Sequence, residues 1–237
     1  MDIKLMKLLF EATLDTLYMS IIATTIAALL AVVPAILLVL CSPSGLKPNA
    51  VVYRVLDAIT NTLRSFPFLI LMVVLFPFTQ WILGKSIGAT AAIVPLSIGA
   101  APFIVRIIEG ALKEVDKGVI EAAQSFGASH FQIIFKIMFI EALPSIVSGI
   151  TLALILVIGF SAMAGAVGGG GLGDIAIKYG YYRFQSDIML YTVVILIVLG
   201  PRDQACYRIS PSSLKKKNLN NTIHYYFLFS MCTYISL

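Results

Sequence analysis

The residues whose types and spacing could support chemistry gather between Glu121 and Pro144, in EAAQSFGASHFQIIFKIMFIEALP. This stretch separates two apolar regions, yet it carries Glu121, His130, Lys136 and Glu141. A charge near the centre of a bilayer costs about 2.5–3.5 kcal/mol even on lenient scales, so the stretch is not expected to cross hydrocarbon. Its chemistry is therefore that of a polar surface held outside the membrane, suited to contact with another molecule.

The rest of the chain offers few residues for a catalytic site or a metal site. His130 and His224 are the only histidines, and no apolar stretch holds paired carboxylates, so neither a metal site nor an acid–base pair can be assembled. The run GGGGLGD, residues 168–174, lacks the Gly-Lys-Ser/Thr of a phosphate-binding loop and follows an apolar helix instead of a strand. We interpret it as a flexible re-entrant or external loop, and the chain as a protein that is not an enzyme.

Two helices joined at a glycine are predicted for the polar stretch. Asp116 can cap the first helix, whose Val119, Ala123 and Phe126 share one face. Gly127 suits the left-handed residue that ends a helix. Ser129 followed by Gln132 is the pattern of a capping box, which would begin the second helix. An ordinary amphipathic helix on the membrane surface is the alternative interpretation of this stretch alone.

The composition is that of a polytopic membrane protein. Of 237 residues, 59% are hydrophobic and 12% are charged, with a mean hydropathy of +0.95, whereas soluble domains average about 25% charged residues. The net charge of +5 is attributed to cytoplasmic Lys and Arg, and no nucleic-acid partner is expected. The three cysteines have no metal or redox spacing.

The predicted fold is all-α, with about five membrane-spanning helices and the helix–Gly–helix loop between the third and the fourth. Residues 1–11 are expected to form a short amphipathic helix on the membrane surface. The spans are predicted at residues 17–40, 66–83, 87–105, 143–167 and 188–200. Arg106 and Glu109 are taken to mark the cytoplasmic exit of the third. The fifth is cut short at Gly200-Pro201, because about 20 apolar residues are needed to cross.

The distribution of Lys and Arg gives an orientation with the N-terminus outside and the polar stretch in the cytoplasm. The expected cytoplasmic segments up to residue 200 carry seven of these residues: Lys47, Arg54, Arg64, Arg106, Lys113, Lys117 and Lys136. The opposite side carries five: Lys4, Lys7, Lys85, Lys178 and Arg183. The excess has the sign that the positive-inside rule requires.

The spacing of Glu121, Ala122, Ala123 and Gly127 resembles the cytoplasmic signature loop of ATP-binding-cassette importer permeases. Further stretches resemble the five-span methionine-importer permeases of this class: NTLRSFPFLILM (61–72), IVPLSIGAAPFIVRIIEGAL (93–112) and GFSAMAGAVGGGGLGDIAIKYGYYRF (159–184). The resemblance covers roughly residues 10–199. One departure is Ile140, where the family often has a proline, although Pro144 is present.

The resemblance implies a permease of the bacterial inner membrane that moves methionine by alternating access. Two permease copies would pair with two ATPase subunits, which hold the ATP, and would receive substrate from a binding protein. This chain itself would bind no cofactor. Glu121, Ala122, Ala123 and Gly127 would contact the ATPase, and Ser161, Met163 and Gly165 would lie near the translocation path. A stand-alone secondary transporter or channel is the alternative function.

Residues 201–237 differ abruptly from what precedes them. They are rich in Lys, Asn, Tyr and Ser and contain two of the three cysteines, and the family resemblance stops before them. We interpret this tail as the product of a shifted reading frame. The alternative is a divergent tail whose apolar end rests on the membrane.

Overall fold

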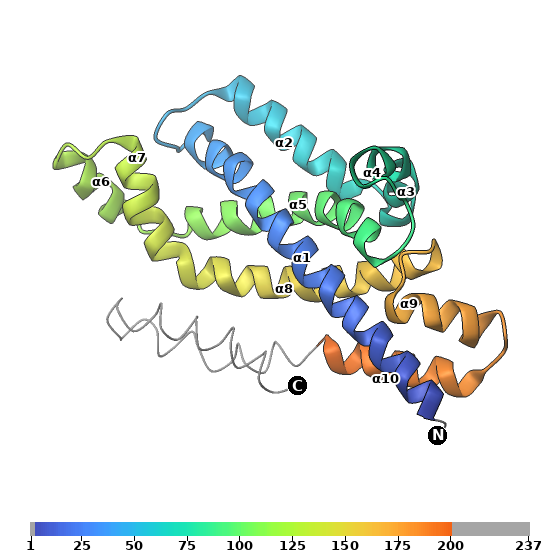
Figure 1. Ribbon diagram of the computed structural model, residues 1–237. Helices are drawn as coiled ribbons and strands as arrows, with labels where there is room; N and C mark the ends of the chain where they lie inside the picture. The colour runs from blue at the N-terminus through green and yellow to red at the C-terminus, as the bar shows by residue number, and fades with distance from the viewer. Residues whose placement is uncertain (1–2, 201–237) are drawn as a thin grey trace.

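The computed structural model describes residues 3–200, and these are folded into helices without any strand. This confirms the all-α prediction. In chain order the helices are α1 (Ile3–Cys41), α2 (Ala50–Ser65), α3 (Phe68–Val74), α4 (Phe76–Leu83), α5 (Ala89–Lys113), α6 (Lys117–Ser125), α7 (His130–Gln132), the π-helical η1 (Ile133–Met138), α8 (Phe139–Ala166), α9 (Gly171–Ile175), the π-helical η2 (Ala176–Tyr181) and α10 (Ser186–Leu199). Figure 1 shows α1 crossing α5 and α8, with α6 and α7 at one end of the bundle.

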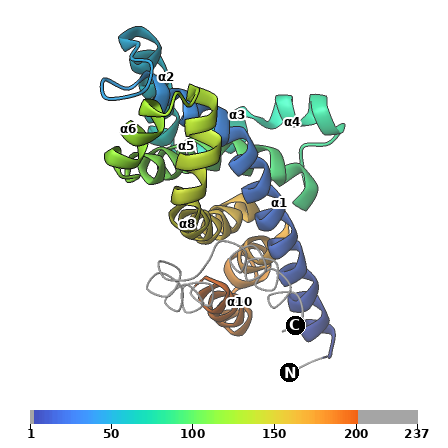
Figure 2. The same ribbon diagram turned by 90° about the vertical axis from the view of Figure 1, so that its left-hand side faces the viewer.

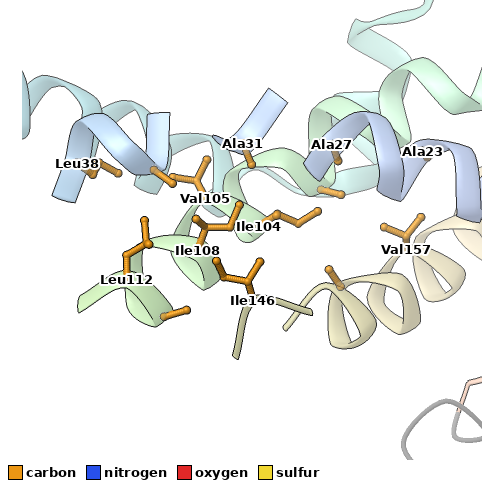
Figure 3. Close-up of a cluster of buried hydrophobic side chains, with 14 of the residues drawn as sticks. Ala23, Ala27, Ala31, Leu38, Ile104, Val105, Ile108, Leu112, Ile146 and Val157 are labelled. Atoms are coloured by element: carbon orange, nitrogen blue, oxygen red, sulfur yellow. The ribbon is translucent and has the colours of Figure 1, made fainter. Parts of the chain in front are cut away.

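The core of the bundle lies between α1, α5 and α8. Helix α1 turns a stripe of fully buried alanines, spaced four residues apart, towards α5: Ala23, Ala27, Ala31 and Ala35. Figure 3 shows Ile104 and Ile108 of α5 below this stripe, and Val157 of α8 beside it. Small side chains let helix backbones approach closely, which is how helices associate where lipid removes the hydrophobic driving force.

Helix α1 is a single helix of 39 residues, so the prediction of a separate surface helix at residues 1–11 is wrong. No glycine or proline occurs between Ile3 and Val33, and nothing in the sequence therefore stops the helix before the span. At 1.5 Å per residue the helix is about 58 Å long, roughly twice the hydrocarbon thickness. Its N-terminal part extends beyond the core and packs on α9 through Leu9 and Ala12.

The second span, predicted as one helix over 66–83, is instead broken into α3 and α4. Pro77 at the start of α4 has no N–H to donate to the preceding turn, and the chain changes direction at Leu75. A second break precedes it at Pro67, where α2 and α3 meet at 101°. Helix α2, which no span included, runs back beside α1 and α5, while Figure 2 shows α4 projecting from the bundle.

Helix α5 is longer than the predicted third span by eight residues at its end, reaching Lys113. Arg106 and Glu109 therefore lie inside the helix, and Glu109 is buried, with 4% of its surface exposed; that they mark the cytoplasmic exit of the span stays a prediction. The helix continues because each charge has a partner of opposite sign, a point developed below.

Three helical runs of the described chain are long and apolar enough to cross a membrane, and α2 with α3 gives a fourth if this bent pair is one span. The runs are α1, α5 and the run that contains α8. Helix α10 is apolar but has only 14 residues. The tail beyond residue 200, with the frameshift hypothesis, lies outside the described residues.

The ends of the helices gather at two opposite ends of the bundle. The N-terminus lies far from α6 in both views, at the end where α8 gives way to α9. There the Gly88 N–H at the start of α5 donates to the Gly168 carbonyl (2.9 Å). The polar stretch and the turn at residues 42–49 lie at the other end.

Candidate functional site

The polar stretch folds as the predicted helix–Gly–helix element, formed by α6, the turn at Gly127 and α7. The Asp116 carboxylate accepts a hydrogen bond from the Gly118 N–H (2.6 Å) and caps α6. Ser129 and Gln132 form a capping box: the Ser129 N–H donates to Gln132 Oε1 (2.9 Å) and the Gln132 N–H to Ser129 Oγ (3.3 Å). Both helix starts are therefore fixed by local side chains.

Gly127 ends α6 in the left-handed conformation, with φ of 78°. Its N–H donates to the Gln124 carbonyl (2.9 Å), and the Ala128 N–H donates to the Ala123 carbonyl (3.1 Å). This pair of bonds is a Schellman motif, which satisfies carbonyls that the end of a helix leaves open. Because residues with a Cβ rarely adopt this φ, the angle between the two helices depends on glycine here.

The second helix of the element does not stop before the fourth span. Helix α7, the π-helical η1 and α8 follow one another without a break from His130 to Ala166, so the predicted start of the span at 143 lies inside α8. Pro144, expected near the start of the span, lies inside α8. A rigid helical run therefore joins the exposed element directly to the core, where Ile146 and Val157 are buried.

The four predicted docking residues come together on this element. Glu121, Ala122 and Gly127 are exposed, and Ala123 is half-buried against the core. The sequence reading missed the neighbouring aromatic side chains: Phe126 is 91% exposed and Phe131 67% exposed. The sequence pattern predicts only that Phe126 shares one face of α6 with Val119 and Ala123. Its position directly before Gly127, outside the last helical turn, is the signal that places it at the tip.

The three residues predicted near the translocation path do not share one surface of α8. Ser161 is fully buried and its hydroxyl donates to the Ile158 carbonyl (2.7 Å). Gly165 is also buried: a Cβ there would lie 2.2 Å from the Asp174 nitrogen and 2.4 Å from the Gly173 carbonyl carbon of α9. Met163 is half exposed. Ser161 and Gly165 are thus packed within the chain, and Met163 alone of the three has an exposed side chain; their place near the translocation path stays a prediction.

The glycine run after α8 is a packed turn, so its interpretation as a flexible loop is wrong; whether it is re-entrant or external stays open. The chain returns along α8 as α9, and Gly165 and Gly173 allow the two backbones to touch. Gly171, with φ of 72°, lies against Thr16 and Met19 of α1, and the Leu172 N–H donates to Thr16 Oγ1 (2.9 Å). The glycines therefore allow the backbone of α9 to lie close to α8 and α1.

Charged side chains in the described part of the chain are paired mainly along α5. Glu109 accepts from Arg106 (2.6 Å) and from Lys113 (2.6 Å), and Arg106 also pairs with Asp57 of α2. No group of three His, Cys, Asp or Glu residues within residues 3–200 is arranged to hold a metal ion.

The sequence of this chain matches a known family of membrane proteins. Residues 39–201 match the family described as the binding-protein-dependent transport system inner membrane component. The chain belongs to this family. It is accordingly the membrane component of a bacterial ATP-binding-cassette importer, located in the inner membrane.

Similar individual proteins are methionine permeases. The chain is 51% identical over 192 residues to the probable D-methionine transport system permease MetI of Vibrio cholerae, covering 81% of this chain and 85% of that protein. It is 44% identical over 191 residues to the methionine import permease MetP of Bacillus subtilis, covering 81% and 86%. A solved structure of the methionine ABC transporter MetNI in inward-facing conformations matches with a TM-score of 0.85 and 42% identity, covering 88% of this chain and 96% of that one.

Proposed function

We propose that this permease carries methionine and is driven by a separate ATPase subunit that docks on the α6–α7 element. The observation that carries the substrate is the 51% identity to a methionine permease across most of both chains. The observation that supports docking is that this element stands at one end of the bundle with its predicted contact residues exposed.

The surface of the element has the composition of a protein contact. Ala122 and Gly127 let a partner approach the backbone, Glu121 offers an anionic group at the rim, and Phe126 offers a large apolar side chain. Exposed aromatic residues surrounded by polar ones are typical anchors of protein interfaces. Phe126 is therefore the residue on which we expect ATPase binding to depend most.

The α6–α7 element is connected directly to two helices of the core, α5 and α8. The run from α7 through η1 to α8 has no loop, and α6 is joined to α5 through the short segment at residues 114–116. Movement of the element when the ATPase closes would thus move α5 and α8 together, and alternating access follows from a change in their tilt. A second copy of the chain would complete the path, and a binding protein would deliver substrate at the opposite end.

The test is co-purification of the permease with the ATPase subunit in mild detergent. The parent chain is expected to retain the ATPase, and Phe126→Ala is expected to lose it while remaining monodisperse. Lys136→Ala, an exposed residue on η1 outside the element, is the matched control. A parent chain that transports methionine without any ATPase subunit would contradict the proposal.

A further inference from the structure

Helix α2 is held against α5 by charged side chains. Arg106 of α5 donates from Nη2 to the Asp57 carboxylate and to Asn61 Oδ1 (2.8 Å), both on α2. Its other nitrogen, Nη1, donates to the buried Glu109 (2.6 Å). The guanidinium therefore joins the two helices while it remains anchored in its own, and its side chain is only 20% exposed.

Two further contacts flank this ion pair in an antiparallel order. Towards the start of α2, the Lys113 ammonium lies 5.6 Å from the centre of the Tyr53 ring. Towards its end, the Arg64 guanidinium lies 6.0 Å from the centre of the Phe103 ring. Together with Asp57–Arg106 these contacts make three rungs, which we name the α2–α5 ladder. Each rung uses a cation, and a cation within about 6 Å of the centre of an aromatic ring is attracted to the ring face.

Apolar packing of α2 against the core is limited to partly buried side chains, chiefly Tyr53 and Leu56. Thr60 is its only buried residue, and the side chains of Val51, Val55 and Ile59 are more than half exposed. The 101° bend at α3 also means that no continuous helix holds α2 from its far end. In contrast, α1 meets α5 through the interlocked alanine stripe. The ladder thus adds directional polar contacts between α2 and α5 to a modest apolar contact.

The ladder stands close to the α6–α7 element. Helix α5 ends at Lys113, which is itself a rung, and Asp116 caps α6 three residues later. A displacement of α6 therefore acts on the end of α5, and the ladder links that part of α5 to α2.

We infer that Arg106 is a positioning residue that makes α2 follow α5 when the α6–α7 element moves, so that ATP hydrolysis is coupled to transport. The inference rests on the proposed function. Without the Asp57–Arg106 rung, α5 still responds to the ATPase, but α2 does not follow it. The expected defect is therefore uncoupling: hydrolysis continues while transport falls.

Asp57→Ala is the variant of choice, because it leaves Arg106 paired with Glu109 and strands no buried charge. Arg54→Ala is the matched control on the same helix, since Arg54 is exposed and forms no ion pair with residues 3–200. In proteoliposomes with the ATPase subunit, we expect Asp57→Ala to lower the methionine transported per ATP by about fivefold or more, the scale of a typical coupling between sites. Arg54→Ala should leave this ratio unchanged, and Asp57→Glu should restore most of it.

Two results would overturn the inference while leaving the proposed function intact. One is an unchanged transport-to-ATP ratio in Asp57→Ala, and the other is an equal fall in Arg54→Ala. A parent protein without ATP-driven uptake would overturn both proposals.

A distance measurement tests the same inference without relying on the transport of a variant. Spin labels at Ala58 of α2 and Gly110 of α5, both exposed, report the separation of the two helices. We expect the distance distribution in the parent complex to be the same without nucleotide and with trapped ATP. In Asp57→Ala it should broaden with trapped ATP. A change of distance in the parent upon ATP trapping would show that α2 does not follow α5.

Discussion

Replacing Gly165 with alanine is expected to damage the bundle, although the change adds only one methyl group. The added Cβ would lie 2.2 Å from the Asp174 nitrogen and 2.4 Å from the Gly173 carbonyl carbon. Favourable contacts between heavy atoms need about 3.5 Å, so α8 and α9 would have to separate by roughly 1 Å. Because the obstacle is backbone, no side-chain rotation relieves it, and overpacking of this kind costs about 1–3 kcal/mol.

Gly159 provides the matched control on the same helix. A Cβ there meets no atom within 4 Å, so Gly159→Ala should gain up to about 1 kcal/mol of helix propensity. Gly165→Ala gains the same propensity, so the two variants should differ by the overpacking cost alone, about 1–3 kcal/mol, which corresponds to roughly 2–12 °C in midpoint for a chain of this size. Thermal unfolding in detergent, followed by size-exclusion chromatography with fluorescence detection, measures the difference.

Equal midpoints for the two alanine variants would refute the close α8–α9 contact. A Gly165→Ala protein that is as stable as its control but transports poorly would instead return Gly165 to the translocation path, where the sequence first placed it.

Other predictions concern the α6–α7 element and the two ends of the chain. Gly127→Val should reduce ATPase binding, because a branched side chain at positive φ costs about 1–3 kcal/mol, whereas Gly127→Asn should retain it in the same co-purification. Glu121→Ala should weaken docking only slightly, within about fivefold by titration, as expected for a rim charge. In a cysteine-free background, a cysteine at Ser129 should react with impermeant thiol reagents only from the cytoplasm, and one at Ser86 only from outside; reversed labelling would invert the topology. Resequencing the codons for Leu199–Arg202 should reveal a frame that continues the fifth helix for about six to ten apolar residues; if no frame does, the tail is genuine.

The parts of the fold that were correctly predicted depend on signals close in sequence. The caps at Asp116 and Ser129 and the left-handed Gly127 each act within three or four residues, so the helix–Gly–helix element could be predicted. The same holds for the all-α fold, because long apolar stretches have few other solutions in a membrane.

The errors occurred where contacts distant in sequence decide the structure. The glycine run was interpreted as flexible because its partners, Thr16 and Met19, precede it by more than 150 residues. The prediction of a separate surface helix at residues 1–11 fails because Leu9 and Ala12 pack on α9, which lies far from them in the sequence. In both cases a local pattern permitted two structures, and tertiary packing selected one.

The central claim is that this chain forms a methionine path driven by ATP on a separate subunit. The most direct measurement is uptake of radiolabelled methionine into proteoliposomes that contain this permease, the ATPase subunit and the binding protein. The account predicts uptake that requires ATP and all three components and that ceases when Phe126→Ala replaces the parent permease. Uptake by the permease alone, driven by an ion gradient and indifferent to ATP, would contradict it and establish a secondary transporter.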